Sequence, residues 1–173
     1  QTGLNLFSYQ ADDIIRFVGG PPATAANTGR QTGHGLELTA SWTLVPSLRL
    51  SGNYAWQQST DETTGQVAGY APEHQLYLRS AWALRAEWSL GAQVKYVGER
   101  PRTAGDVRPA VDGYTLADLT LRRKHLGEHW GLAMSVRNLF DVDAREPSPA
   151  PGLIANDLPL PGRNYYLEIR YRP

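Results

Sequence analysis

Apolar and polar residues alternate with a period of two over most of this sequence. One such segment places Glu37, Thr39, Ser41 and Thr43 between the apolar residues Leu36, Leu38, Ala40, Trp42 and Leu44. Successive side chains of a β-strand point to opposite faces of a sheet, so each segment predicts a strand with one apolar and one polar face. No helical stripe competes with this pattern. The sequence therefore predicts an all-β fold with antiparallel strands.

Eight strands are expected, at residues 4–16, 31–44, 48–58, 74–84, 88–99, 113–123, 129–138 and 164–172. Two of them have an irregular pattern. Asp12-Asp13 interrupts the first strand. In 113–123 the apolar parity changes from Tyr114 and Leu116 to Leu119 and Leu121, which predicts a β-bulge.

Short and long connections alternate strictly along the chain. The short ones are 45–47, 85–87 and 124–128, and the long ones are 17–30, 59–73, 100–112 and 139–163. Long irregular connections are uncommon in compact soluble domains. Transmembrane β-barrels have short periplasmic turns, long extracellular loops and strands of about 9–11 residues. The connections therefore favour a transmembrane barrel.

The aromatic residues divide between the two ends of the expected strands. Those near a short connection are Trp42, Trp82, Trp88 and Trp130, and those toward a long one are Tyr54, Trp56, Tyr96, Tyr114 and Tyr165. Amphipathic rings prefer the level of the lipid headgroups. These residues, together with Tyr171, are therefore expected to form membrane girdles in contact with outer-membrane lipid and lipopolysaccharide.

Composition and motifs exclude several classes of function. The 17 Lys and Arg residues balance the 17 Asp and Glu residues, so no net field favours nucleic acid, and there is no Cys to bind a metal or act as a nucleophile. No apolar run is long enough for a transmembrane helix. The chain begins at Gln1 without a signal peptide, which suggests a processed product or an excised fragment. We expect no cofactor, no metal and no enzymatic activity.

Several other polar residues are candidates for a metal, ion or substrate site. His125 and His129 flank Glu128 at a Gly-containing turn, and the pairs Asp12-Asp13, Asp61-Glu62 and Asp141/Asp143 lie in or near loops, where turn chemistry explains them. Arg100, Arg102 and Arg108 of one long loop, with Tyr70, are the candidate substrate-binding residues. Guanidinium groups bind carboxylate or catecholate oxygens in bidentate fashion. The alternative is a solvated loop that contacts lipopolysaccharide phosphates.

Ordered motifs resemble the end of TonB-dependent receptors. The penultimate strand ends in Asn138, Leu139, Phe140 and Asp141, and the last one opens with Pro161, Gly162 and Arg163. Similar elements occur upstream in the order of the family, at 33–38, 71–74, 96–100 and 112–119. The resemblance implies that residues 1–173 are the last eight strands of a 22-stranded barrel, without its N-terminal plug domain and earlier strands.

The implied function is active transport across the outer membrane of a Gram-negative bacterium. Substrates of this family are scarce nutrients, most often ferric siderophores, and the energy comes from TonB through the missing N-terminal region. Two alternatives stay open at this point. One is a self-contained eight-stranded outer-membrane barrel with a structural or adhesive role, and the other is a soluble carbohydrate-binding β-sandwich.

Overall fold

The computed structural model describes residues 1–18, 22–148, 154 and 156–173 of the chain. The main strands are β1 (Thr2–Val18), β2 (Thr24–Val45), β3 (Leu48–Asp61), β5 (His74–Ala83), β6 (Trp88–Val97), β7 (Tyr114–Leu126), β8 (Trp130–Arg137) and β11 (Asn164–Tyr171). Three short strands are β4 (Gln66–Val67), β9 (Arg145–Glu146) and β10 (Leu158–Pro159). Within the described ranges, no helix is long and apolar enough to cross a membrane.

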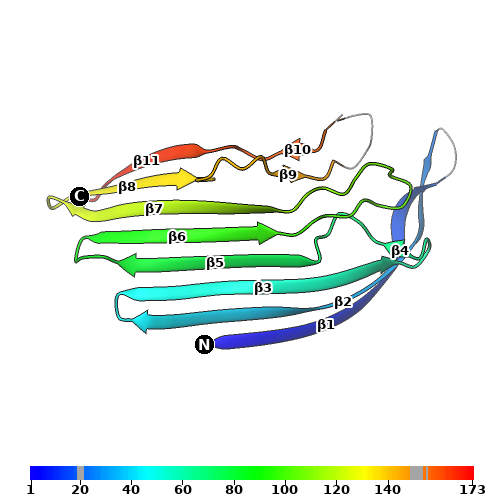
Figure 1. Cartoon of the computed structure of the whole chain (residues 1–173), viewed down its shortest axis with the longest axis horizontal. Coiled ribbons are helices and arrows are strands. Elements are labelled where there is room, and N and C mark those ends of the chain that lie inside the picture. The colour runs from blue at the N-terminus through cyan, green and yellow to red at the C-terminus, as the bar shows by residue number, and fades with distance from the viewer. Residues whose placement is uncertain (19–21, 149–153, 155) are drawn as a thin grey trace.

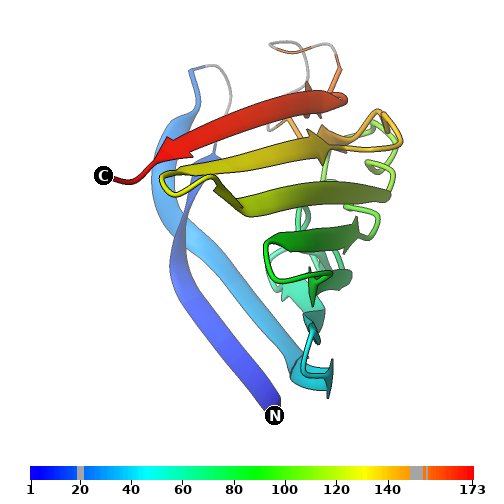
Figure 2. The ribbon, with the colours of Figure 1, turned by 90° about the vertical axis from the view of Figure 1, so that its left-hand side faces the viewer.

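The main strands form one antiparallel sheet in the order β1-β2-β3-β5-β6-β7-β8-β11, with β4 added beside β3. Each strand therefore pairs with its neighbours in the chain (Figure 1). The sheet is a single curved layer with β1–β2 and β11 on either side of its concave face (Figure 2). β1 and β11 lie at opposite ends of the strand order and do not pair with each other in the described part of the chain. The eight expected strands are confirmed, as an open arc of sheet.

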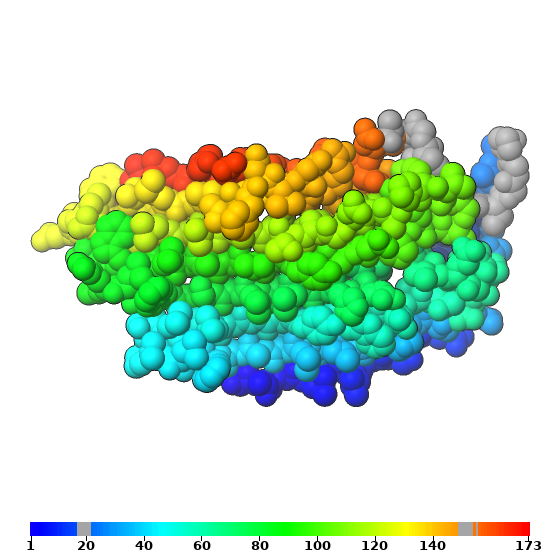
Figure 3. All heavy atoms as spheres, viewed as in Figure 1, coloured from blue at the N-terminus to red at the C-terminus, as the bar shows by residue number. Residues whose placement is uncertain are grey.

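Two opposite ends of the sheet differ in their connections. The short turns and the C-terminus lie at one end, and the long connections lie at the other (Figure 1). The strands make a continuous wall between these ends (Figure 3). The apolar face of this wall is strongly exposed: Leu6 is 70% exposed, Leu167 64% and Ile169 63%. The polar side chains occupy the concave face.

The first long connection is shorter than the sequence suggests. Residues 17–30 were expected to form a loop, but β1 and β2 stay paired as far as Val18 and Thr24. That prediction is wrong because a two-stranded ribbon satisfies main-chain hydrogen bonds without needing an apolar face. The irregularity at Asp12-Asp13 is confirmed. The register shifts between Ala11 and Ile14, and Asp13 has a φ of 58°.

The bulge expected within 113–123 is also wrong. Pairing between β6 and β7 is continuous from Val97–Tyr114 to Trp88–Arg123, and the shift lies instead between Arg123 and Leu126. Tyr114 and Leu116 therefore face the concave side. Tyr114 is only 5% exposed and belongs to a small core with Val97 and Ala144. Its assignment to a membrane girdle was wrong because a distant loop covers it, which local alternation does not reveal.

The other girdle candidates lie on the apolar face in two rows. Cross-strand pairs place Trp42, Trp82, Trp88, Trp130 and Tyr171 at the end with the short turns. Tyr54, Trp56, Tyr96 and Tyr165 lie toward the long connections. The rings of Trp130 and Tyr171 are 4.9 Å apart. The two rows are as expected; their contact with a bilayer stays a prediction.

Candidate functional site

The Asn-Leu-Phe-Asp segment forms a tight turn at the end of β8. Asn138 has a φ of 49° and is 3% exposed. Its side-chain nitrogen donates to the carbonyl oxygens of Val142 at 2.9 Å and Pro161 at 3.3 Å, and its side-chain oxygen accepts from Val142 N at 2.9 Å. Asn tolerates positive φ better than most residues. Asn138 therefore holds the backbone of the turn and joins it to the segment before β11.

Asp141 connects the same turn to the Pro-Gly-Arg segment. Its Oδ1 accepts a hydrogen bond from the main-chain N–H of Arg163 at 2.7 Å, and the Arg163 guanidinium lies 3.5 Å from Oδ2. These contacts lower the pKa of Asp141, with the main-chain bond as the largest cause. A Cβ at Gly162 would lie 2.9 Å from Asp141 Oδ1, which explains the glycine. Phe140 is 72% exposed.

Asp118 is the centre of a hydrogen-bond network on the concave face, next to this turn. Its carboxylate accepts hydrogen bonds from Gln93 at 2.5 Å, from the Arg137 guanidinium at 3.0 Å and from Asn138 N at 2.8 Å. Gln93 in turn accepts a hydrogen bond from the Tyr77 hydroxyl at 2.9 Å. The network joins β5, β6, β7 and the end of β8 across the sheet. It fixes the base from which the long connections start.

Arg100 is buried where two long connections meet. It is 1% exposed, and its guanidinium donates to the carbonyl oxygens of Asp112 at 3.0 Å and Arg145 at 2.6 Å. The guanidinium also lies 5.0 Å from the centre of the Tyr114 ring, whose hydroxyl donates to Glu146 at 2.7 Å. Carbonyl oxygens rather than solvent therefore surround this predicted substrate-binding cation. Its substrate contact stays an untested prediction.

Arg102 and Arg108 belong to a loop ion-pair network, which we define as Arg102, Asp106, Arg108, Ser148 and Asp157. Arg102 binds both carboxylate oxygens of Asp157, at 2.6 and 2.7 Å. Arg108 pairs with Asp106 at 2.6 Å and donates to the hydroxyl of Ser148 at 2.8 Å. The hydrogen bonds from Arg102 lower the pKa of Asp157 to about 2, and those from Arg108 lower that of Asp106 to about 2. Both carboxylates are therefore charged at neutral pH.

Tyr70 brings a third connection to the same place. It has a φ of 63°, and its N–H donates to the carbonyl oxygen of Pro101 at 2.7 Å. The structure thus gathers all four sequence-predicted binding residues, Tyr70, Arg100, Arg102 and Arg108, at the end with the long connections. Three connections form one assembly there, in which the side chains of Arg102 and Arg108 are 6% and 18% exposed.

Sequence reasoning missed the acidic partners in this assembly. Asp157 pairs with Arg102, 55 positions earlier in the chain, and Glu146 accepts a hydrogen bond from Tyr114, 32 positions earlier; no local pattern signals such contacts. Asp106 could have been found, since it precedes Arg108 by two residues in a Gly-containing loop. Ser148, which is fully buried, gives no signal in the sequence.

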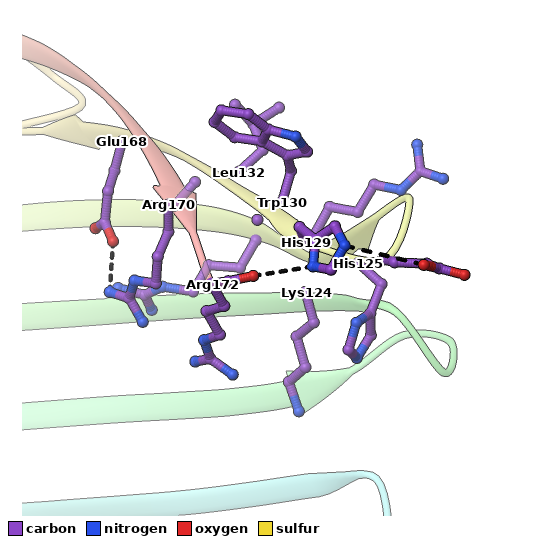
Figure 4. A pocket seen from close by; sticks show the side chains of 13 residues that line it. Lys124, His125, His129, Trp130, Leu132, Glu168, Arg170 and Arg172 are labelled. Atoms are coloured by element: carbon purple, nitrogen blue, oxygen red, sulfur yellow. Dashed lines mark hydrogen bonds and ion pairs between the residues drawn. The ribbon is translucent and has the colours of Figure 1, made fainter.

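A second polar site lies at the end with the short turns. Residues from β7, β8 and β11 line a hollow of about 400 Å³ on the concave face (Figure 4). We call it the basic hollow; its lining includes Arg122, Lys124, Glu128, Gly131, Ala133, Glu168, Arg170 and Arg172. Lys124, Arg170 and Arg172 project to the side of the sheet opposite Trp130 and Leu132 (Figure 4).

The two histidines near this hollow do not form a metal site with their neighbours. His129 Nδ1 lies 3.0 Å from the carbonyl oxygen of Arg172, and its Nε2 lies 3.9 Å from Glu128. Among the residues that the structure describes, no group of three or more His, Cys, Asp or Glu side chains could hold a metal ion. The carboxylate pairs at 12–13, 61–62 and 141/143 are explained by ion pairs and turns, such as Arg16–Asp61 and Arg145–Asp143.

Comparison with known proteins decides the family. A family model described as "TonB dependent receptor-like, beta-barrel" matches residues 1–139. The chain belongs to the TonB-dependent receptor β-barrel family. Among curated members, the catecholate siderophore receptor Fiu of Escherichia coli (strain K12) is 27% identical over 130 residues, which are 69% of this chain.

Solved TonB-dependent receptors share the fold. The closed form of the ferric-catecholate import receptor Fiu from K12 E. coli superposes with a TM-score of 0.77 and 21% identity, covering 99% of this chain and 25% of that one. The copper transporter OprC gives a TM-score of 0.80 with 19% identity, covering 99% of this chain and 28% of that one. The chain spans 17% of the length of the curated Fiu relatives. These relatives are receptors and transporters rather than enzymes.

Proposed function

We propose that this chain forms the last eight strands of a 22-stranded outer-membrane barrel that takes up a ferric siderophore of the catecholate class. In this proposal an N-terminal plug domain and the earlier strands lie outside residues 1–173. Energy comes from TonB, which acts through that N-terminal region. The eight-stranded sheet forms part of the barrel wall, with the short turns in the periplasm and the long connections outside the cell.

The likeness to Fiu is the observation on which the substrate class rests. It spans 130 residues at 27% identity, and that relative is a catecholate siderophore receptor. The family match supports the architecture over residues 1–139. The fold alone does not separate substrates, because a copper transporter superposes as well as a siderophore receptor.

The assembly of long connections supports a ligand-binding role. It places Arg102 and Arg108 beside Tyr70 near the outer end of the barrel wall. A ferric catecholate is anionic, and guanidinium groups bind its oxygens with charge-assisted hydrogen bonds. We assign substrate contact to Tyr70, Arg102 and Arg108, with the catecholate oxygens displacing the carboxylates of Asp157 and Asp106 from the two guanidinium groups, and support of the loops to the buried Arg100.

The same sheet supports an outer-membrane location in a Gram-negative bacterium. Its apolar face carries exposed aliphatic residues between two rows of aromatic residues, which is the pattern of the lipid-facing surface of transmembrane β-barrels. Lipid and lipopolysaccharide are the proposed neighbours of this face. A soluble sandwich would need a second sheet packed on the first, and a closed eight-stranded barrel would need β1 paired with β11; the described strands make neither contact.

Uptake by the full-length parent protein tests the proposal. A strain that lacks its own catecholate receptors is complemented with the parent gene, and entry of radioactive iron is measured with a ferric catecholate in the presence and absence of TonB. We expect uptake only with TonB and only from the catecholate, with a ferric hydroxamate as the matched control. Uptake of copper but not of the ferric catecholate, or uptake without TonB, would reject the proposal.

A further inference from the structure

We propose that Asp157 determines specificity at the substrate site, because its carboxylate is a built-in competitor that keeps weakly binding anions off Arg102. The inference rests on the proposed function, in which the catecholate takes the place of this carboxylate. It goes beyond that function by making the pair of Arg102 and Asp157 the threshold that any anionic ligand must exceed before it binds.

Every nitrogen of the Arg102 side chain has an acceptor. The two terminal nitrogens donate to the two carboxylate oxygens of Asp157 at 2.6 and 2.7 Å, and Nε donates to the carbonyl oxygen of Pro109 at 2.9 Å. The side chains of Arg102 and Asp157 are only 6% and 16% exposed. Bidentate pairing of a guanidinium group with a carboxylate is among the stronger charge-assisted interactions in proteins. An anionic ligand therefore reaches Arg102 only when Asp157 leaves.

The two carboxylates of the loop ion-pair network differ in how the chain holds them. Asp106 lies two residues before Arg108 and also accepts a hydrogen bond from the main-chain N–H of Arg108 at 3.1 Å, so it remains beside its arginine even when a ligand displaces it. Asp157 belongs to another connection, 55 residues after Arg102. It also lies 4.0 Å from the Arg108 guanidinium. Departure of Asp157 therefore removes negative charge from both guanidinium groups.

The connection that carries Asp157 has other anchors. Arg100 donates to the carbonyl oxygen of Arg145 at 2.6 Å, and the Tyr114 hydroxyl donates to Glu146 at 2.7 Å. The short strand β10, which directly follows Asp157, pairs with β9. Departure of the Asp157 carboxylate therefore breaks its ion pair and leaves the base of the connection in place.

The equilibrium between paired and unpaired Arg102 sets the threshold. If the guanidinium is free of Asp157 for only a small fraction of the time, the apparent affinity of every ligand that uses Arg102 falls by that fraction. A weakly binding anion such as phosphate then stays unbound. A ferric catecholate still binds, because two adjacent anionic oxygens replace both hydrogen bonds to Asp157. The bound catecholate and the carboxylate repel each other, so Asp157 moves away from Arg102.

Binding to the purified full-length parent protein, measured by titration calorimetry, tests the competitor. Asp157→Asn keeps the shape of the side chain and removes its charge. We expect the dissociation constant for ferric dihydroxybenzoate to fall about tenfold, as when a competent fraction of about a tenth rises to nearly one. The dissociation constant for inorganic phosphate should fall by the same factor, because both ligands use Arg102. Asp157→Ala should act in the same direction, and Asp157→Glu should return both constants toward the wild-type values.

Matched variants define the outcomes. Asp143→Asn should leave both constants unchanged, because Asp143 pairs with Arg145 outside the loop ion-pair network. In an Arg102→Gln background, Asp157→Asn should no longer tighten binding. Phosphate binding by Asp157→Asn that is equal to or weaker than that of the wild type, or tightening that persists without Arg102, overturns the inference. Failure of the catecholate to bind any variant, with phosphate binding tightened as expected, rejects the proposed substrate alone.

Discussion

The carboxylate of Asp141 accepts a hydrogen bond from the main-chain N–H of Arg163 at 2.7 Å, although 22 residues separate them. This contact closes the connection between β8 and β11 just before the last strand starts. The residues of both family motifs, Asn-Leu-Phe-Asp and Pro-Gly-Arg, therefore act as one structural unit that positions β11 against β8.

Replacing Asp141 tests this unit. Asp141→Asn weakens the charge-assisted bond to Arg163 N, so we expect a smaller folded fraction of the full-length parent in outer membranes, measured by its heat-modifiable mobility on gels. Asp143→Asn is the matched control, because Asp143 pairs only with the exposed Arg145 nearby. Equal folded fractions for the two variants would show that the contact does not position β11.

Substitutions at Asn138 separate backbone conformation from hydrogen bonding. Asn138→Gly keeps the φ of 49° accessible and removes the side-chain hydrogen bonds, at a cost of about 1–3 kcal/mol. Asn138→Ala loses the same bonds and also adopts an unfavourable φ, which costs roughly 1–2 kcal/mol more. We expect thermal unfolding to rank wild type above Gly and Gly above Ala. An Ala variant as stable as the Gly variant would contradict the assigned role of φ.

Arg100 should resist replacement by another cation. Arg100→Lys removes the planar group that reaches both Asp112 and Arg145 carbonyl oxygens, leaving at least one buried acceptor unpaired at a cost of about 1–3 kcal/mol. Thermal unfolding of the full-length parent should show a lower midpoint. Arg85→Lys, in an exposed turn, should not shift it. A similar midpoint for both variants would mean that Arg100 is not a structural cation.

Acid should separate the two long connections of the loop ion-pair network. The pKa of Asp157 is lowered to about 2 from an ordinary 3.8. A lowered pKa stabilises the folded arrangement above the ordinary value, and this contribution is lost as the pH falls through about 2. Distances between spin labels at positions 104 and 156 should therefore be narrow at pH 7 and broaden between pH 4 and 2.

The Asp157→Asn variant should give the broad distribution at every pH. Asp143→Asn should behave like wild type, because its carboxylate pairs outside this network. A narrow distribution in Asp157→Asn at neutral pH would show that the Arg102–Asp157 pair does not hold the connections together.

Adjacent residues of β11 test which face meets lipid. Leu167 lies at mid-strand on the apolar face, opposite Met134, and Tyr166 lies on the concave face. Leu167→Arg should destabilise the barrel in bilayers by about 2–4 kcal/mol, the cost of a cation near the bilayer centre, and Tyr166→Arg by much less. Denaturant titration in lipid vesicles measures both. The reverse order would mean that the faces have been assigned the wrong way round.

Most of the fold was predictable because period-two alternation reports strands directly. The strands, their order and the two aromatic rows follow from it. It failed at Tyr114 and Leu116, which loop residues such as Ala144 cover on the concave face. Period-two alternation also failed to predict the strands over residues 17–30, because the paired ribbon there has no buried face and therefore needs no alternation of apolar and polar residues.

The candidate site was predictable only in part. Arg100, Arg102 and Arg108 stand out because arginine in a Pro- and Gly-rich loop is conspicuous, and the structure does bring them together with Tyr70. Their burial depends on partners far along the chain, the carbonyl oxygen of Arg145 for Arg100 and the carboxylate of Asp157 for Arg102, and no local pattern signals either partner. Folding, rather than residue type, therefore decides which partner each of the three arginines binds.

Pairing only between chain neighbours has a consequence for assembly. Each hairpin can form as soon as its own two strands are available, so no strand waits for a partner from the far end of this segment. Slow loop closure limits the folding rate of many β-proteins. Here it is divided among the closures of individual hairpins. The longest connection to close lies between β8 and β11, from Arg137 to Asn164, and the contact between Asp141 and Arg163 shortens that search.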